Sequence, residues 1–521
     1  RVLRMKFALG LFENPYTDEK RADTILRCPE HLATAEKIAE KSIVLLKNDG
    51  LLPLRKDLRS VAVIGPAADT VSYGDYTETR GRKGGVSVLD GIRAAVSPET
   101  EVLYERGCNF LGQALHPFDP SMLRDENGEA GLTGRYYNGP VPQGEPVQVR
   151  TDRTVNFNWI FALPHPELDA NCFSVAWTGS VIMPKTMDGC IGLSTQDSMR
   201  LYVDDKLLID GWGKDKSADQ ALDFHFEAGR TYKIRIEFVN DRRGARVIFG
   251  YSAGRENFPA AVEAARKADV AILCMGDNEE TSGENFDRTD LNLPGRQLEL
   301  VQAVYATGTP VVLVLQSGRP VTANWENDHL PAILEAWFPG EQGGTAIAKT
   351  LFGDAAPGGR LPITFPRSVG QIPCHYSRRP GGGKRYVEMD WLPLYPFGYG
   401  LTYTTFAYRD MALSRSVIDP QDTVTVSVTV TNTGKYTGDA VPQLYVRDMF
   451  SSVVKPERQL AAFRRLTLAP GESRRVELTV GPKQLRTLGP DYVWRVEPGK
   501  FELQLGDNAE NILLRADLTV E

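Results

Sequence analysis

An acidic segment at residues 276–288 is the part of this chain best suited to chemistry. It reads GDNEETSGENFDR and carries three glutamates and two aspartates. It directly follows Val270–Met275, an apolar run that predicts a buried strand. Its charge has the wrong sign for holding phosphate. An enclosed carboxyl group, however, can keep its proton near neutral pH and act as a general acid. A solvated acidic loop without chemistry is the alternative.

Other candidate residues carry weaker signals. Arg82–Gly85 could contact an anion and Gly74–Tyr76 could line a site, with a solvated turn as the alternative. Trp212, in the turn DGWG, is the aromatic residue that we expect to be exposed and able to stack on the apolar face of a sugar. The six cysteines and six histidines show neither C-x-x-C nor H-E-x-x-H spacing, so we expect no metal site and no cofactor.

The acidic segment belongs to a series of apolar runs and amphipathic helices. We predict strands over 60–64, 270–275, 311–315 and 333–337. We predict helices over 33–48, 260–268, 297–305 and 344–351. This alternation predicts an open α/β sandwich with helices on both faces of a sheet. In such sheets ligands gather at the carboxyl ends of the strands, where the acidic segment would lie.

Two other stretches predict β structure with almost no helix. Residues 127–253 are rich in aromatic residues at alternating positions, which indicates a β-sandwich inserted into the α/β domain. Insertion into a surface loop costs little when the two ends of the loop lie close together. In the last stretch Val424, Val426, Val428 and Val430 alternate with polar residues, which is typical of an immunoglobulin-like or fibronectin-type sandwich.

Length and composition exclude several classes of protein. The 521 residues carry a net charge of −7 and are 42% hydrophobic, which indicates a folded chain of about three domains. Mild acidity argues against nucleic acid or an anionic membrane as the main partner. Apolar runs such as Val311–Leu315 are far too short to span a bilayer.

A series of motifs runs from residue 1 to about residue 406. They are LFENPY (11–16), EKSIVLLKN (40–48), VIGP (63–66), DRTDLNLPGRQ (287–297), QSGRPV (316–321), AWFPGEQGG (336–344), GGRLPITFP (358–366) and PFGYGLTYTTF (396–406). In these motifs and their order the chain resembles glycoside hydrolase family 3. The stretch 127–253 resembles the protective-antigen-like β-sandwich of some β-glucosidases of this family, and the tail resembles their fibronectin type III-like domain.

The resemblance implies a division of the chain into five segments. They are the end of a (β/α)₈ barrel with a linker (1–32), the first part of the α/β sandwich domain (33–126), the inserted β-sandwich (127–253), the second part of the α/β domain (254–400) and the fibronectin type III-like domain (401–521). In the family the barrel carries the nucleophilic aspartate in a Ser-Asp-Trp-like motif. These residues contain neither that motif nor the Lys-His-Phe motif of the barrel. A barrel also takes about 250 residues. We therefore expect the nucleophile to lie outside this chain.

The chemistry that the resemblance implies is retaining hydrolysis with two carboxyl groups. One attacks the sugar, and the other protonates the leaving oxygen and later deprotonates water. By similarity to the family's loop, Glu284 is the expected acid/base. The family usually has glycine at the next position, where this chain has Asn285, and Glu280 is the alternative acid. We expect Asp287 and Arg288 to pair with each other and brace the loop.

The resemblance therefore predicts an exo-acting, β-glucosidase-like hydrolase whose insert shapes the entrance. The expected partners are an oligosaccharide or β-glycoside substrate and a barrel on the same or a separate chain. β-Xylosides or arabinosides are alternative substrates, and a barrel-less, non-catalytic carbohydrate-binding fragment or one chain of a split glycosidase is the alternative function. Homo-oligomerisation and location, whether periplasmic, secreted or cytoplasmic, stay open.

Overall fold

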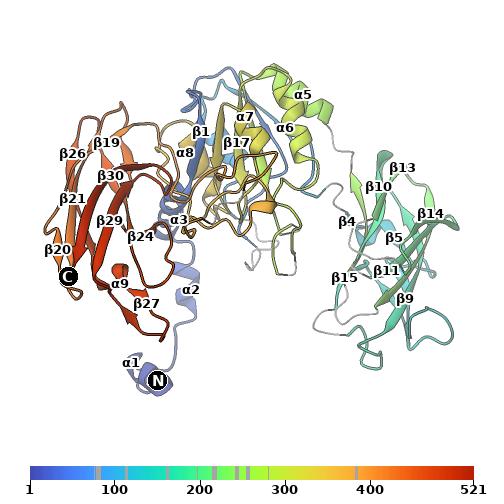
Figure 1. Ribbon diagram of the computed structural model, residues 1–521. Coiled ribbons are helices and arrows are strands. Elements are labelled where there is room, and N and C mark those ends of the chain that lie inside the picture. Colours follow the sequence, from blue (N-terminus) through green and yellow to red (C-terminus); the bar gives the residue numbers. More distant parts are fainter. Residues whose placement is uncertain are drawn as a thin grey trace. The chain divides into compact units, whose positions relative to one another are not determined.

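The computed structural model describes residues 1–74, 77, 84–111, 115–159, 163–195, 197–213, 220–240, 246–253, 258–279, 281–284, 286–381 and 385–521. The chain divides into two compact units (Figure 1). The first consists of Arg1–Arg106 and Ala260–Glu521, and the second is Gly107–Pro259. The first unit contains an α/β domain and the C-terminal β-sandwich, whereas the second is all β. Among the described residues, no helix is both long and apolar enough to cross a membrane.

The α/β domain is built on a six-stranded sheet in the order β1-β18-β17-β16-β2-β3. β1 pairs with β18 in antiparallel fashion, and all other neighbours are parallel. The central strands are buried at every position, which explains their uninterrupted apolar sequences. The strands are β1 (Val44–Asn48), β2 (Ser60–Ile64), β3 (Glu101–Glu105), β16 (Val270–Gly276), β17 (Val311–Gln316) and β18 (Ala332–Glu335).

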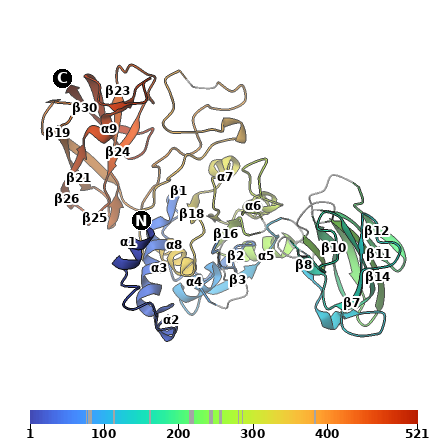
Figure 2. The ribbon, with the colours of Figure 1, turned by 90° about the horizontal axis from the view of Figure 1, so that it is seen from below.

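Helices cover both faces of this sheet, as the sequence predicts. α3, α4 and α8 lie together on one face, where α8 contacts both of the others, and α6 and α7 lie on the other face (Figure 2). Ser87 caps α4 by accepting a hydrogen bond from the backbone of Asp90. The helices of the first unit are α1 (Val2–Ala8), α2 (Lys20–Ile25), α3 (Pro29–Ser42), α4 (Val88–Ala95), α5 (Phe258–Lys267), α6 (Gln297–Tyr305), α7 (Asn324–His329), α8 (Gly343–Leu351) and α9 (Pro482–Leu485).

The predicted helix over residues 33–48 is wrong in its second half. α3 ends at Ser42, and Val44–Asn48 forms the edge strand β1. Val44, Leu45 and Leu46 are all buried, so this stretch lacks the polar face that a surface helix needs. Pairing with β18 satisfies its backbone and buries its apolar side chains at the same time.

The order of the strands reverses between β2 and β16. From β2 the chain continues to β3 on one side, and from β16 it continues to β17 and β18 on the other. Ligands of open α/β sheets bind at such a switch point, outside the carboxyl ends of the strands. The backbones are very close here: a Cβ on Gly65, whose φ is +125°, would lie 2.2 Å from the carbonyl oxygen of Cys274. Only glycine fits there.

The second unit packs two antiparallel sheets against each other. One has the order β13-β10-β15-β4, with β8 on β15, and the other has the order β12-β11-β14-β9-β6-β7, with β5 on β9. Since β4 and β5 precede residue 127, this unit extends further toward the N-terminus than the expected range 127–253. The strands are β4 (His116–Pro117), β5 (Leu123–Arg124), β6 (Leu132–Asn138), β7 (Gln148–Asp152), β8 (Asn156–Asn158), β9 (Phe173–Ile182), β10 (Met187–Thr195), β11 (Ser198–Val203), β12 (Lys206–Asp210), β13 (Gln220–Phe226), β14 (Thr231–Asn240) and β15 (Arg246–Ala253).

The core of the second unit is aromatic and contains the buried carboxylate of Asp152. Asp152 accepts hydrogen bonds from the hydroxyl of Tyr136 (2.6 Å) and the indole nitrogen of Trp177 (2.7 Å), and its other oxygen accepts from Arg150 Nε (2.7 Å). Its charge is thus paired and its oxygens are hydrogen-bonded, as burial requires.

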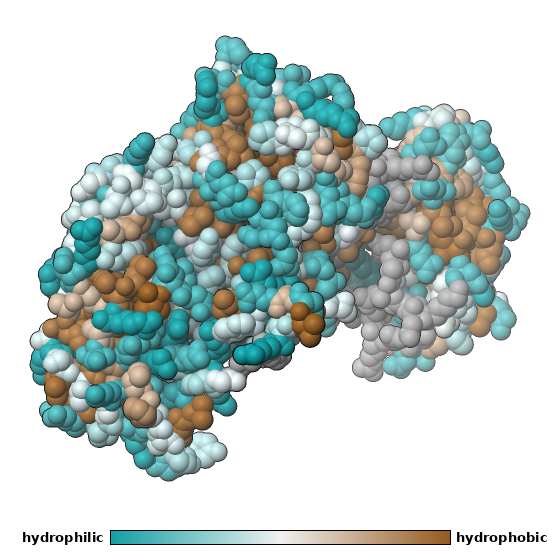
Figure 3. Space-filling view, turned by 45° about the horizontal axis from the view of Figure 1, so that its top comes forward, coloured by the Kyte–Doolittle hydropathy of each residue, from teal (hydrophilic) through white to brown (hydrophobic). Residues whose placement is uncertain are grey.

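On the visible face of this unit, hydrophobic side chains gather in a broad group (Figure 3).

The C-terminal sandwich has the alternation that the sequence predicts. Val424, Val426, Val428 and Val430 of β21 are all buried. One sheet has the order β19-β21-β26 and the other β20-β30-β29-β23-β24. Its strands are β19 (Phe406–Leu413), β20 (Val417–Ile418), β21 (Val424–Asn432), β22 (Gly438–Ala440), β23 (Gln443–Asp448), β24 (Gln459–Phe463), β25 (Leu466–Leu468), β26 (Ser473–Val480), β27 (Thr487–Leu488), β28 (Trp494–Arg495), β29 (Gly499–Gly506) and β30 (Ile512–Val520).

Candidate active site at the strand ends

Asp277 is the first residue after β16 and anchors the acidic loop. Its backbone nitrogen donates to the carbonyl oxygen of Gln316 on β17 (2.8 Å). The residue is only 2% exposed. Its Oδ1 accepts a hydrogen bond from Thr281 Oγ1 (2.9 Å) within the loop, and its Oδ2 accepts one from Ser317 Oγ (2.7 Å) just after β17. One buried carboxylate thus joins the ends of two neighbouring strands.

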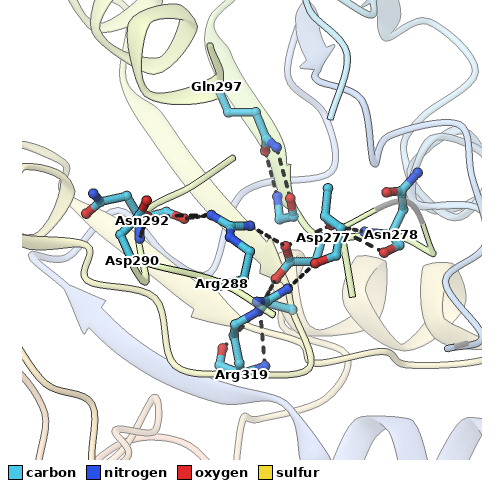
Figure 4. A network of polar contacts seen from close by, with 10 residues as sticks. Asp277, Asn278, Arg288, Asp290, Asn292, Gln297 and Arg319 are labelled. Carbon is cyan, nitrogen blue, oxygen red and sulfur yellow. Dashed lines mark hydrogen bonds and ion pairs between the residues drawn. The ribbon is translucent and has the colours of Figure 1, made fainter. Parts of the chain in front are cut away.

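Two guanidinium groups flank this carboxylate (Figure 4). Arg319 Nε donates to Asp277 Oδ2 (3.1 Å), and Arg288 Nη1 lies 3.5 Å from Asp277 Oδ1. Arg288 Nη2 also donates to the carbonyl oxygen of Asn292 (3.1 Å) and lies 3.5 Å from Asp290 Oδ1. The network therefore compensates the buried charge and connects the beginning of the loop to its end.

Two further contacts fasten the loop to the sheet. Arg319 Nη2 donates to the carbonyl oxygen of Thr281 (2.5 Å), which holds the middle of the loop against β17. At the base of the loop, the side chain of Gln297 accepts from the backbone nitrogen of Gly276 (2.8 Å) and donates to its carbonyl oxygen (2.9 Å). Gln297 is the first residue of α6, so this amide links the end of β16 to the next helix (Figure 4).

A second acidic side chain lies at the end of β18, close enough to Asp277 for their charges to interact. Glu335 is fully buried, and its Oε1 accepts from the backbone nitrogen of Trp337 (2.9 Å). Burial raises the pKa of the Glu335 carboxyl well above its ordinary value, and the charge of Asp277 raises it further. Its Oε2 has no hydrogen-bond partner among the described residues. Burial therefore disfavours the charged form of this carboxyl relative to that of an exposed glutamate.

The predicted acid/base, Glu284, is exposed on the loop that Asp277 fastens. It follows Gly283, whose carbonyl oxygen accepts from the backbone nitrogen of Phe286 (3.2 Å) in a turn. The loop thus combines an anchored base with an exposed glutamate. Glu280 and Asn285 lie outside the described residues, as do Asp75, Tyr76, Arg82 and Lys83 of the weaker candidates.

The expected pair of Asp287 and Arg288 is not the one that the structure contains. Arg288 contacts the carboxylates of Asp277 and Asp290, and the side chain of Asp287 is exposed. The buried carboxylate holds Arg288 more effectively than an exposed neighbour would, because water screens exposed ion pairs.

Trp212 lies in the second unit and is half-buried. Its backbone nitrogen donates to Asp210 Oδ1 (3.3 Å), and the guanidinium of Arg200 lies 4.9 Å from its ring centroid. This cation–π contact covers one face of the indole. The other face is the one that a sugar could use.

Other functional candidates are found only in three dimensions. Ser317 and Arg319 belong to the motif QSGRPV, and Glu335 directly precedes the motif AWFPGEQGG, yet nothing in the sequence pairs them with the acidic loop. Their position after two parallel strands beside β16 is the signal that could have found them. Among the residues that the structure describes, no group of three His, Cys, Asp or Glu side chains could hold a metal ion.

Comparison with known proteins agrees with this fold. The chain has an α/β sandwich followed by a fibronectin type III-like domain, to which residues 440–509 match. Residues 43–403 match the glycosyl hydrolase family 3 C-terminal domain. The chain therefore belongs to glycoside hydrolase family 3, which confirms the resemblance seen in the sequence.

Its relatives include several glycosidases. A beta-glucosidase of Rhizobium radiobacter is 34% identical over 556 residues, covering 100% of this chain and 66% of the relative. A beta-xylosidase of Formosa agariphila is 45% identical over 302 residues, covering 56% of this chain and 42% of the relative. The crystal structure of the beta-glucosidase of Kluyveromyces marxianus in complex with glucose matches with a TM-score of 0.71 and 28% identity, covering 95% of this chain and 63% of that one. The chain thus spans about two thirds or less of the length of these relatives.

Proposed function

We propose that this chain forms the acid/base half of a retaining, exo-acting β-glycosidase of the β-glucosidase type. The observation that carries the proposal is the anchored acidic loop at the switch point of the sheet, in a chain whose relatives are named beta-glucosidases. Glu284 protonates the glycosidic oxygen as the first bond breaks. It then removes a proton from the water that releases the covalent intermediate.

The nucleophile of this reaction comes from a (β/α)₈ barrel outside these residues. Retaining hydrolysis needs the two carboxyl groups about 5–5.5 Å apart, so the barrel must face the loop that carries Glu284. Since Glu284 is exposed in this chain, the barrel and the substrate supply the enclosure around it. The rigid base of the loop supports this role, because acid catalysis depends on a fixed distance.

We further propose that the all-β unit is a protective-antigen-like insert that shapes the leaving-group side of the entrance. Its two-sheet architecture and its place in the sequence, between the two segments of the first unit, support this assignment. Trp212 is our candidate for stacking on the leaving-group sugar.

The sugar at the non-reducing end is glucose in this proposal. Relatives over 95–100% of this chain are named beta-glucosidases. The similarity to a beta-xylosidase over 56% of the chain favours β-xylosides as the second candidate. Comparing kcat/KM for aryl β-glucosides and aryl β-xylosides distinguishes the two.

The test joins this chain to a family barrel that carries the nucleophile. Glu284→Gln should lower turnover of an alkyl or sugar β-glucoside by about 10²–10⁴-fold, the usual contribution of general acid catalysis. It should affect the first step much less for a dinitrophenyl glucoside, because such a leaving group needs little protonation. Glu279→Gln, an exposed glutamate of the same loop, is the matched control and should retain full turnover.

Three outcomes would overturn this assignment. Full activity of Glu284→Gln on an alkyl glucoside, with loss in Glu280→Gln, would transfer the role to Glu280. Hydrolysis of aryl glucosides by this chain alone would show that the nucleophile lies within it. Sugar binding without hydrolysis, even beside the barrel, would favour a non-catalytic carbohydrate-binding chain.

A further inference from the structure

A cleft lies in the first unit, between residues 364–397 and the C-terminal sandwich. Its volume is about 100 Å³, and none of the residues of the acidic loop lines it. On the same scale of cavity volume, a site for one water molecule takes about 10–15 Å³. The cleft therefore has room for several water molecules, or for a ligand the size of a single sugar ring. Its lining includes Tyr376, Arg378, Tyr386, Trp391, Phe397 and Glu510.

Aromatic rings form much of the wall of this cleft. Tyr376 stacks on Phe397 with 4.2 Å between the ring centroids and 16° between the planes. Trp391 is 40% exposed, and the guanidinium of Arg378 lies 4.5 Å from its ring centroid. An aromatic plane that is held in place and partly open to solvent suits the apolar C–H face of a sugar.

The charged groups of the cleft favour a neutral ligand. Arg378 Nη1 donates to Glu510 Oε1 (2.9 Å), and Arg378 Nε donates to Glu457 Oε2 (3.1 Å). Both carboxylates compensate the charge of Arg378, and of the two only Glu510 lines the cleft, so a phosphorylated or acidic sugar gains little from this guanidinium and meets a carboxylate beside it. A carboxylate that accepts hydrogen bonds beside a guanidinium that donates them suits neighbouring hydroxyl groups of a sugar.

Hydrogen bonds between the two domains hold the walls together. The backbone nitrogen of Glu457 donates to the carbonyl oxygen of Arg378 (2.8 Å), and that of Leu460 donates to the hydroxyl of Tyr376 (3.1 Å). A site formed by elements that are already fixed requires little ordering when a ligand binds.

We propose that this cleft binds one neutral sugar ring, in addition to the active site to which the acid/base loop contributes. The aromatic wall contacts the apolar face of the ring, and Arg378 with Glu510 hydrogen-bonds its hydroxyl groups. The site binds without catalysing a reaction, so it does not depend on the proposed hydrolysis. Since both domains line it, its occupant stabilises their junction.

The test is calorimetric titration of the purified chain with D-glucose, D-xylose, cellobiose and glucose 6-phosphate. We expect saturable, millimolar binding of at least one neutral sugar and at least tenfold weaker binding of the phosphate. Trp391→Ala should weaken binding by roughly tenfold. Glu510→Gln, which keeps the shape of the wall, should weaken it severalfold, and Glu284→Gln should leave it unchanged.

Trp494→Ala is the matched control. Trp494 is 54% exposed in the C-terminal sandwich, and the guanidinium of Arg486 lies 4.5 Å from its ring centroid, so its surroundings resemble those of Trp391. Circular dichroism and melting curves establish that each variant folds. Absence of saturable sugar binding, equal losses in Trp391→Ala and Trp494→Ala, or loss of binding in Glu284→Gln would each overturn the proposal.

Discussion

Replacing Asp277 with asparagine should loosen the acidic loop while leaving the rest of the chain folded. The substitution keeps the volume of the side chain and removes its charge. Asp277 faces two guanidinium groups and accepts from two hydroxyls, so the amide leaves Arg288 and Arg319 without their shared counter-charge. The loop is held by these contacts at its beginning, middle and end, and we expect it to open as one segment.

The expected size of the effect follows from burial. Removing one partner of a buried ion pair costs about 3–5 kcal/mol. The side chains of Arg288 and Arg319 remain 18% and 20% exposed, so water compensates part of the loss. We therefore expect about 2–3 kcal/mol in the free energy of local opening, which makes amide exchange roughly 30- to 160-fold faster. A single free energy of global unfolding would not report this change well, because the chain has several domains.

Hydrogen exchange followed by mass spectrometry measures this prediction directly. Peptides that cover residues 277–292 should exchange faster, and peptides of the all-β unit should not change. Asp290→Asn is the matched control, because Asp290 lies in the same loop, contacts Arg288 at 3.5 Å and is half exposed. It should change exchange by less than about fivefold. Unchanged exchange over 277–292 in Asp277→Asn, or an equal increase in Asp290→Asn, would refute the role of Asp277 as anchor.

Two further predictions concern stability. Burial raises the pKa of Glu326 from 4.5 to about 7, so the unfolded chain ionises first and stability falls as pH rises through this range. Glu326→Gln should remove this loss, about 3 kcal/mol at most, and an unaltered pH dependence of Tm would contradict the assignment. Gly276→Ala should lower Tm more than Gly308→Ala, because its Cβ would lie 2.0 Å from the carbonyl oxygen of Gln316, whereas Gly308, also at positive φ, has nothing within 4 Å. Equal Tm values would argue against this close approach.

Much of the fold was predictable because its signals are local. The run Val270–Met275 is apolar at every position, and a strand buried on both faces needs that composition. The valines of β21 alternate because only one face of that strand is buried. Residues 44–48 were predicted wrongly, since their apolar positions fit a helix as well as a strand, and an open sheet edge beside β18 decided between the two.

The candidate site likewise has features that the sequence predicts and features that only the three-dimensional structure shows. By itself the sequence determined that an acidic loop follows a buried strand, that Glu284 lies in it and that the chain belongs with family 3. Only the tertiary structure decided that Arg319, 42 positions further along, pairs with Asp277, and that Glu335 is fully buried. The physical reason is that partnership and burial depend on the order of the strands. β16, β17 and β18 are neighbours in the sheet, so their ends meet, whereas the sequence separates them by two helices.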